Sequence, residues 1–300
     1  MEIYVKKLIA NLTKKKYGKI NLILDGGAFS GSYILGSLYY LKELELQNKI
    51  KIHKMSGCSI GSLLCVLYKL NDLDYCCDIY GKIRTYFKEH GNLYILSDVL
   101  KDLKSKMPND FYKLCNNTVY LNYHDISTNQ CIFKKTYQNN DELLETIMRS
   151  SYIPFICGET AFYKKKYIDG LVPYTFKKKR TLFINLCMDY KCMIGMMNIK
   201  NEVNNIERIM CGILNVHNFF VSETPTTMCY YINEMTLTQK ILHIFRLIII
   251  RILVAKFYIS NHLYSWLEDN IKYSKYCNLI NVINSCFKNL AHMYIRYFMV

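Results

Sequence analysis

The sequence predicts an α/β fold with a mainly parallel central sheet and a helical C-terminal part. Two short apolar segments, residues 20–24 and 51–55, each run into a glycine-containing loop that is followed by an apolar helical pattern. Strand, loop and helix in this repeated order favour parallel strands joined by right-handed crossovers. From about Ile199 onward the pattern is mostly helical. At 300 residues and 51% hydrophobic content, the chain can bury a large core.

The elements follow from local patterns along the chain. Residues 20–24 form a short apolar run bounded by glycines, as in the buried strands of parallel sheets. Residues 31–46 carry leucines at roughly one-turn spacing, which predicts a helix. A second strand over residues 51–55 precedes a second helix that ends near Leu70. The remaining predicted elements are helices near 72–89, 97–106 and 141–150, strands near 118–123, 131–135 and 181–186, and a hairpin over 161–168.

Charge and cysteine content restrict the environment and the partners. The formal net charge of +15 favours anionic partners, either nucleic acid or an anionic membrane surface. The 13 cysteines are odd in number and include no CxxC pair, so we expect free thiols and no zinc site. The N-terminal residues have no long apolar run and no cleavage site of small residues, which predicts an intracellular, cytoplasmic protein.

The segment from Gly57 to Gly61, GCSIG, lies between a predicted strand and a predicted helix. Glycines two residues on either side of Ser59 leave room for a sharp turn that exposes the hydroxyl group. The start of the following helix adds positive partial charge. This pattern is typical of a nucleophilic serine, although an ordinary glycine turn with a capping serine would have the same sequence.

A second glycine loop, residues 25–31 with the sequence DGGAFSG, also joins a strand to a helix. Small residues let backbone N–H groups converge on an anion, as an acyl-transfer enzyme requires at its oxyanion hole. A phosphate-binding loop is the alternative, because Gly26 and Gly31 have the required separation. Ser32 stands where that loop needs lysine, which argues against nucleotide binding.

Asp169 and Gly170 follow the predicted hairpin. An aspartate at the end of a strand can lie against a serine and accept its proton, whereas an isolated Asp-Gly pair is more often a simple hairpin turn. His53 precedes the GxSxG segment and would suggest a triad. A histidine within that strand is more consistent with a side chain in a neighbouring layer.

Taken together, these motifs resemble the patatin-like phospholipase family, and most closely its animal triacylglycerol-lipase branch. The resemblance covers about residues 19–187 and includes a serine- and proline-containing segment at 150–155. It implies a three-layer sandwich in which Ser59 and Asp169 form a catalytic dyad. The implied oxyanion-hole residues are Gly26, Gly27 and Ala28, and the supporting motif residues are Asp25, Gly31, Gly57, Gly61 and Gly170.

The resemblance implies a metal-independent serine acyl-ester hydrolase without cofactors, acting as a phospholipase A, a lysophospholipase or a neutral-lipid lipase. An acyltransferase on the same dyad, a non-enzymatic lipid-binding relative and a basic nucleic-acid-binding protein are the alternatives. Three positions depart from the family pattern. Ala28 replaces the third loop glycine, Ser30 stands where many members carry lysine or arginine, and Leu171 replaces a small residue.

The resemblance also implies a division of the chain. We expect a basic N-terminal segment over residues 1–18, a patatin-like catalytic domain over 19–190 and a mostly helical region over 191–300, either separate or packed on the same domain. The expected partner is a membrane phospholipid or a lipid-droplet surface, bound peripherally, and a protein activator would be compatible with this. Nucleic acid is not expected as a partner.

Two further segments bear on that partner. Lys164, Lys165 and Lys166 precede Asp169, and residues 177–180 follow it with a second basic run. Such runs are usually solvated loop tips, but they could instead attract anionic head groups to the site. Residues 241–259 are strongly apolar, yet Arg246, Arg251 and Lys256 interrupt them. We expect a buried or partly membrane-dipping helix there, with a true membrane span as the alternative.

Overall fold

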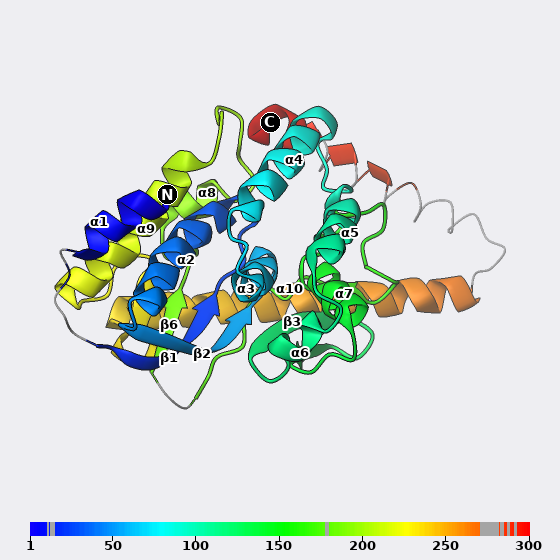
Figure 1. Ribbon diagram of the computed structural model, residues 1–300. Helices are drawn as coiled ribbons and strands as arrows, with labels where there is room; N and C mark the ends of the chain where they lie inside the picture. The colour runs from blue at the N-terminus through cyan, green and yellow to red at the C-terminus, as the bar shows by residue number, and fades with distance from the viewer. Residues whose placement is uncertain are drawn as a thin grey trace.

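A mixed, mostly parallel sheet forms the centre of the molecule (Figure 1). The computed structural model describes residues 1–10, 12, 16–177, 180–270, 282, 285–286, 289–290 and 293–300. In this part of the chain the sheet has seven strands, six of them in the order β4-β3-β2-β1-β6-β7, while β5 pairs with β3. The strands are β1 (Gly18–Leu24), β2 (Ile50–Gly57), β3 (Val119–Asp125), β4 (Gln130–Lys134), β5 (Tyr167–Ile168), β6 (Thr181–Ile184) and β7 (Cys229–Tyr231).

The four central strands, β3, β2, β1 and β6, are parallel, and the three outer pairings are antiparallel. The carboxyl ends of the parallel strands therefore lie at one edge of the sheet. The helices are α1 (Glu2–Ala10), α2 (Gly31–Leu46), α3 (Ile60–Leu70), α4 (Tyr75–His90), α5 (Leu96–Lys106), α6 (Phe111–Cys115), α7 (Asn140–Ser150), α8 (Tyr190–Ile194), α9 (Ile206–Ser222) and α10 (Leu237–Asn270).

The predicted α/β class and the opening strand–helix–strand–helix order are confirmed. α2 has the predicted bounds, and α3 ends at Leu70 as expected. The predicted hairpin over 161–168 is reduced to a single bridge between Tyr163 and Tyr167, after which β5 pairs with β3. β7 lies in the region predicted to be mostly helical, and pairing with β6 stabilises it as a strand.

The sheet separates two apolar clusters because successive side chains of a strand point to opposite faces. In β1, Ile20, Leu22 and Leu24 belong to the large cluster that α2 and α3 share. Ile23 points the other way and packs with Phe183 and Tyr230. The cysteines in the described part of the chain are free thiols, as predicted.

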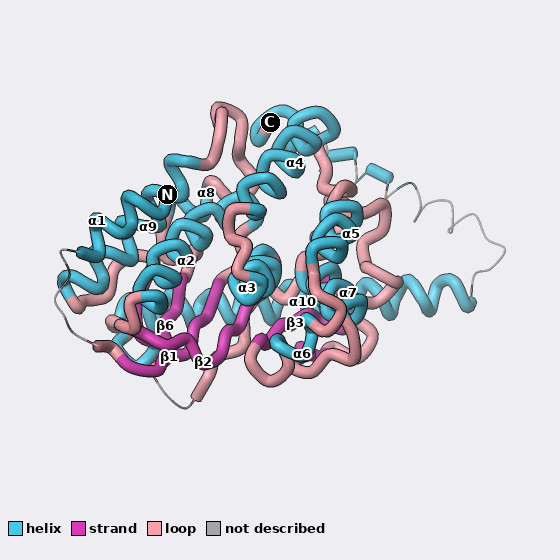
Figure 2. The backbone as a smooth tube through the Cα atoms, in the orientation of Figure 1, coloured by secondary structure: helices cyan, strands magenta, loops and turns pink. Residues whose placement is uncertain are grey.

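Two described elements beyond residue 190 pack with the elements of the predicted catalytic domain. β7 extends the sheet beyond β6, and α9 lies beside α2 (Figure 2). A Cβ atom at Gly36 of α2 would lie 2.0 Å from the carbonyl oxygen of Ile209, and one at Gly212 of α9 would lie 2.0 Å from that of Tyr33. These two glycines therefore allow the helix backbones to touch.

Helix α10 has 34 residues and runs along much of the molecule (Figure 1). Its contacts place it across the carboxyl edge of the sheet, since Arg246 pairs with Asp25 after β1 and Val254 packs on Ile126 after β3. Of the two forms expected for residues 241–259, a buried helix is wrong, because one face of α10 is exposed along this segment, whereas a partly membrane-dipping helix stays a prediction. Within the described residues, no helix is long and apolar enough to cross a bilayer.

Candidate active site

Ser59 occupies a sharp turn between β2 and α3. Its backbone angles, φ 52° and ψ −130°, lie in a region that is unfavourable for a residue with a side chain. The Ser59 N–H donates to both the carbonyl oxygen and the Oγ of Ser150, each at 3.0 Å. A Cβ at Gly57 would lie 2.3 Å from the Gly61 carbonyl oxygen, and one at Gly61 would lie 2.5 Å from that of Asp25. Close backbone packing thus requires both glycines of the motif and holds the strained serine in place.

The loop after β1 lies directly against this turn. A Cβ at Gly26 would lie 3.0 Å from Ser59 Cβ, a tight contact that glycine avoids as the loop approaches the turn. The sequence predicts that the Gly26 N–H is an oxyanion donor. In the structure this N–H instead donates to Asp25 Oδ1 at 2.9 Å and is therefore already engaged. In the part of the chain that the structure describes, the N–H groups of Gly27 and Ala28 have no hydrogen-bond acceptor. Ala28 has a φ of 43°, a strained value for a residue with a side chain.

Asp169 follows β5, and its buried carboxylate lies near the Ser59 hydroxyl. Its Oδ1 accepts a hydrogen bond from the Leu171 N–H at 2.7 Å. Burial raises the pKa of Asp169 to about 6, while the Leu171 N–H, the Ser59 hydroxyl and the nearby Arg246 partly oppose this rise. A carboxylate with this pKa is ionised at neutral pH but still basic enough to accept a proton from an attacking hydroxyl.

The segment that ends α7 connects the two loops. The Ser150 carbonyl oxygen accepts the N–H of Gly170 at 3.1 Å as well as that of Ser59, and the Tyr152 carbonyl oxygen accepts the Asp169 N–H at 3.1 Å. Ser150 Oγ is also 2.7 Å from Ser62 Oγ. In the sequence, the 150–155 segment is identified only as one of the motifs that resemble the patatin-like family. In the structure, its hydrogen bonds hold the Ser59 turn and the Asp169 loop in position relative to each other.

Two residues of β3 hold the Asp169 loop and were missed in the sequence. Asn122 Nδ2 donates to the carbonyl oxygens of Gly170 at 2.8 Å and Val172 at 2.6 Å. His124 Nδ1 donates to the Asp169 carbonyl oxygen at 3.0 Å, and burial lowers the pKa of His124. The imidazole therefore supports the backbone of the loop. His53 occupies the bulge in β2 where its register with β1 shifts, before the strand reaches Ser59.

Arg246 of α10 makes a bidentate ion pair with Asp25, with Nη1–Oδ2 and Nη2–Oδ1 distances of 2.8 and 2.6 Å. Its Nη2 also donates to the Leu171 carbonyl oxygen at 2.8 Å. The Asp25 side chain is completely buried, and that of Arg246 is 13% exposed. One guanidinium therefore ties the glycine loop to the Asp169 loop. No local pattern in the sequence reveals this pair, whose members are 221 residues apart.

A second arginine approaches the glycine loop from α9. Arg208 Nη1 lies 3.4 Å from Ser30 Oγ and donates to the Gly195 carbonyl oxygen at 2.7 Å. The Ser30 hydroxyl itself donates to the Cys192 carbonyl oxygen at 2.6 Å. A basic group therefore lies beside position 30, although the residue at that position is a serine.

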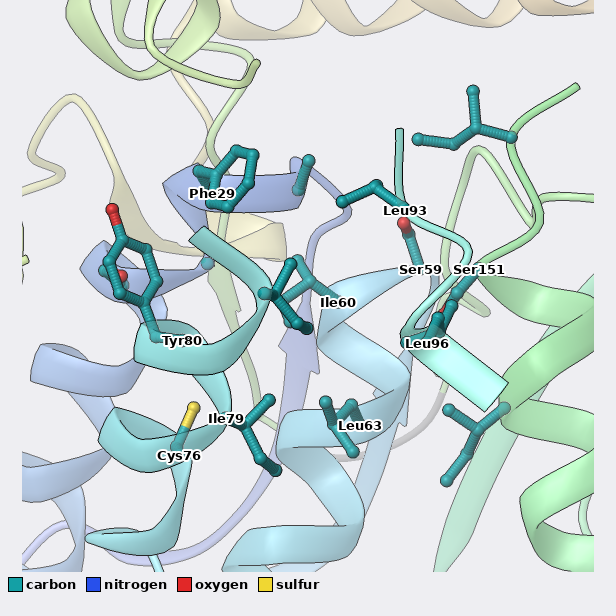
Figure 3. A pocket seen from close by; sticks show the side chains of 16 residues that line it. Phe29, Ser59, Ile60, Leu63, Cys76, Ile79, Tyr80, Leu93, Leu96 and Ser151 are labelled. Atoms are coloured by element: carbon teal, nitrogen blue, oxygen red, sulfur yellow. The ribbon is translucent and has the colours of Figure 1, made fainter. Parts of the chain in front are cut away.

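An apolar pocket that is partly open to solvent lies beside Ser59. Figure 3 shows Ser59 and Ser151 on one side and Ile79 of α4 on the other, with Leu63 of α3 between them. Ala28 of the glycine loop also lines the pocket. Most of the other lining side chains are aliphatic or aromatic, so the space beside the serine suits a hydrocarbon chain.

The lysines predicted as head-group contacts lie on an exposed turn. Lys164 Nζ is 2.7 Å from Glu145 Oε1, and Lys165 and Lys166 are exposed. The second basic run, residues 177–180, falls partly outside the described residues. Within it, Arg180 lies 3.6 Å from Glu234. Contacts of these lysines with head groups therefore stay a prediction.

Comparison with known proteins supplies one relative of interest. The chain is similar to the probable lipid hydrolase 463L of Invertebrate iridescent virus 6, with 27% identity over 186 residues. The alignment covers 52% of this chain, and the chain spans about three fifths (61%) of the length of that relative. No family model matches the sequence.

Proposed function

We propose that this protein is a patatin-like lipid acyl hydrolase with a three-layer fold, in which Ser59 is the nucleophile and Asp169 its catalytic partner. The observation that carries the proposal is the Ser59 hydroxyl, which lies near the buried Asp169 carboxylate at the wall of an apolar pocket. The similarity to a protein named as a probable lipid hydrolase supports the same substrate class. The expected substrates are phospholipid or neutral-lipid acyl esters.

The geometry supports a two-step reaction. Ser59 Oγ attacks the ester carbonyl carbon while its proton passes to the Asp169 carboxylate. The carbonyl oxygen becomes an oxyanion, which accepts hydrogen bonds from the Gly27 and Ala28 N–H groups. Collapse of this intermediate breaks the bond to the alcohol, which leaves with the proton from Asp169. Water then attacks the acyl-serine, with Asp169 again taking the proton. Collapse of the second intermediate returns that proton to Ser59 and releases the fatty acid.

Fatty-acid release from mixed phospholipid vesicles and from a triacylglycerol emulsion, measured without calcium, tests the proposal. Wild type should release fatty acid, Ser59→Ala should release none, and a fluorophosphonate probe should label only the protein with Ser59 intact. Ser97→Ala, which changes an exposed serine on α5, is the matched control and should behave as wild type. Release that survives in Ser59→Ala would refute the proposal, and acyl transfer to added alcohol in preference to water would reassign the protein as an acyltransferase.

The pKa of Asp169 predicts the acid side of the pH profile. The carboxylate must be ionised to accept the serine proton, so kcat/KM for a short soluble ester should fall about tenfold per pH unit below about pH 6. It should level off above pH 7. A profile with its acid limb near pH 4 would show that burial does not govern the basicity of Asp169.

The apolar pocket predicts a preference for long acyl chains. Ile79 lies across the pocket from Ser59 (Figure 3), so Ile79→Phe should shorten the space for the chain. We expect kcat/KM for a palmitoyl ester to fall by about tenfold while that for a butyryl ester is unchanged. Ile79→Leu conserves side-chain volume and is the control. Equal losses for both esters would indicate that the acyl chain lies elsewhere.

A further inference from the structure

Helix α10 presents a broad apolar face to solvent. Ile241, Ile244, Phe245, Ile248, Ile249 and Ile252 are each between 46% and 65% exposed. At about 100° per residue these six side chains span an arc of roughly 140° on one side of the helix. The opposite side packs against the protein through residues that include Arg246, Ile250 and Val254. Apolar surface of this extent on a folded chain marks an interaction site.

The charges on α10 indicate what kind of surface this face contacts. The only acidic residues of α10 are Glu268 and Asp269 at its C-terminal end, whereas Lys240, Arg251 and Lys256 are all exposed. Lys240 and Arg251 lie along one margin of the apolar arc and Lys256 lies within it. Long basic side chains can reach lipid phosphates while their stems rest on apolar surface. The +15 net charge of the whole chain acts in the same direction.

We infer that α10 binds an anionic phospholipid bilayer, lying in the plane of the interface with its apolar arc among the acyl chains. Such an orientation suits a helix that exposes an apolar face with basic side chains on it and along one margin, and that is not long and apolar enough to span a membrane. The inference rests on the proposed function, because such a bilayer would present the lipid esters that the proposed hydrolase cleaves. It assigns the contact to α10 and not to the exposed turn at Lys164.

The same helix is joined to the site by its inner face. Arg246 binds Asp25 and the Leu171 carbonyl oxygen, so α10 lies between the proposed bilayer surface and the two loops beside Ser59. A helix with its side chains is about 10 Å across. Docking through α10 would therefore hold the loops of the site within about one helix diameter of the lipid head groups.

Vesicle co-sedimentation tests the inference without depending on catalysis. All proteins carry Ser59→Ala so that the lipid stays intact. The vesicles contain phosphatidylcholine alone or with about 30 mol% phosphatidylserine, which makes their surface negative. The triple variant Phe245→Ser, Ile249→Ser and Ile252→Ser should bind at least about tenfold more weakly than its parent. A control triple, Ile194→Ser, Val203→Ser and Val221→Ser, removes apolar side chains that are 52%, 80% and 59% exposed elsewhere and should bind like its parent.

A second variant tests the charge. Lys240→Glu, Arg251→Glu and Lys256→Glu together should abolish the preference for phosphatidylserine, and the preference of the parent should weaken as salt is raised. In the Ser59-intact background, both α10 variants should hydrolyse a soluble butyryl ester like wild type. If no protein hydrolyses any ester, the proposed function fails, while the binding comparison still decides the role of α10.

Three outcomes would overturn the inference. One is unchanged vesicle binding by the α10 serine variant. Another is a dimeric parent, measured by light scattering, that becomes monomeric in this variant, which would make the face an interface between two copies. The third is a fall in Tm several degrees larger than in the control triple, which would show that the rest of the chain covers the face.

Discussion

Replacing Arg246 with methionine is expected to lower the free energy of unfolding by about 3–5 kcal/mol and kcat/KM for a soluble ester by about 10². The completely buried Asp25 carboxylate would keep its bonds from the Gly26 and Leu186 N–H groups but lose its counter-charge. The Leu171 carbonyl oxygen would lose its donor as well. Both loops beside Ser59 would then be free to shift, and small displacements of catalytic groups are costly.

Thermal and urea unfolding together with butyryl-ester kinetics measure this effect. Arg251→Met is the matched control, because it removes an exposed arginine from the same helix and should change stability by less than about 0.5 kcal/mol. Adding Asp25→Asn to Arg246→Met should restore part of the stability, since the unpaired buried charge is then absent. Equal stability of the Arg246→Met and Arg251→Met proteins would contradict the role assigned to this ion pair.

The parts of the fold and site that local sequence patterns predict are those whose causes are local. A few consecutive residues are enough to recognise the apolar run of β1, the leucine spacing of α2 and the two glycine loops. For this reason the strand–helix–strand–helix opening could be predicted, with Ser59 at a turn. β7 could not, because its three residues become a strand only by pairing with β6.

The residues that hold the site together have non-local causes. Asn122 and His124 lie in the buried strand β3 and bind a loop more than 40 residues later. Arg246, read in the sequence as one of several charges around an apolar helix, is instead the one that faces Asp25. The Gly26 N–H, predicted as an oxyanion donor, is engaged by the neighbouring carboxylate, an orientation that only backbone coordinates reveal.

Replacing Asp169 with asparagine is expected to lower kcat/KM by about 10³ or more while making the folded protein more stable at neutral pH. Asparagine cannot accept the Ser59 proton, so general-base assistance is lost. Its side-chain oxygen can still accept the Leu171 N–H that Asp169 Oδ1 accepts at 2.7 Å, and its amide can donate to Ser59 Oγ. The loop should therefore keep its conformation.

The gain in stability follows from the sign of the pKa change. The pKa of Asp169 is about 6 in the folded protein and 3.8 ordinarily, so the folded state binds the proton more tightly and stability falls as pH rises from about 4 to 6. Above pH 6 the buried charge costs at most about 3 kcal/mol, which asparagine does not incur. Urea unfolding should therefore show Asp169→Asn more stable than wild type by about 1–3 kcal/mol at pH 8, with the difference vanishing near pH 4. An Asp169→Asn protein that is inactive and less stable than wild type at pH 8 would mean that Asp169 holds the loop through its charge. Loss of activity together with higher stability would instead show that the Asp169 carboxylate lowers the stability of the fold and supplies the basicity that the reaction requires.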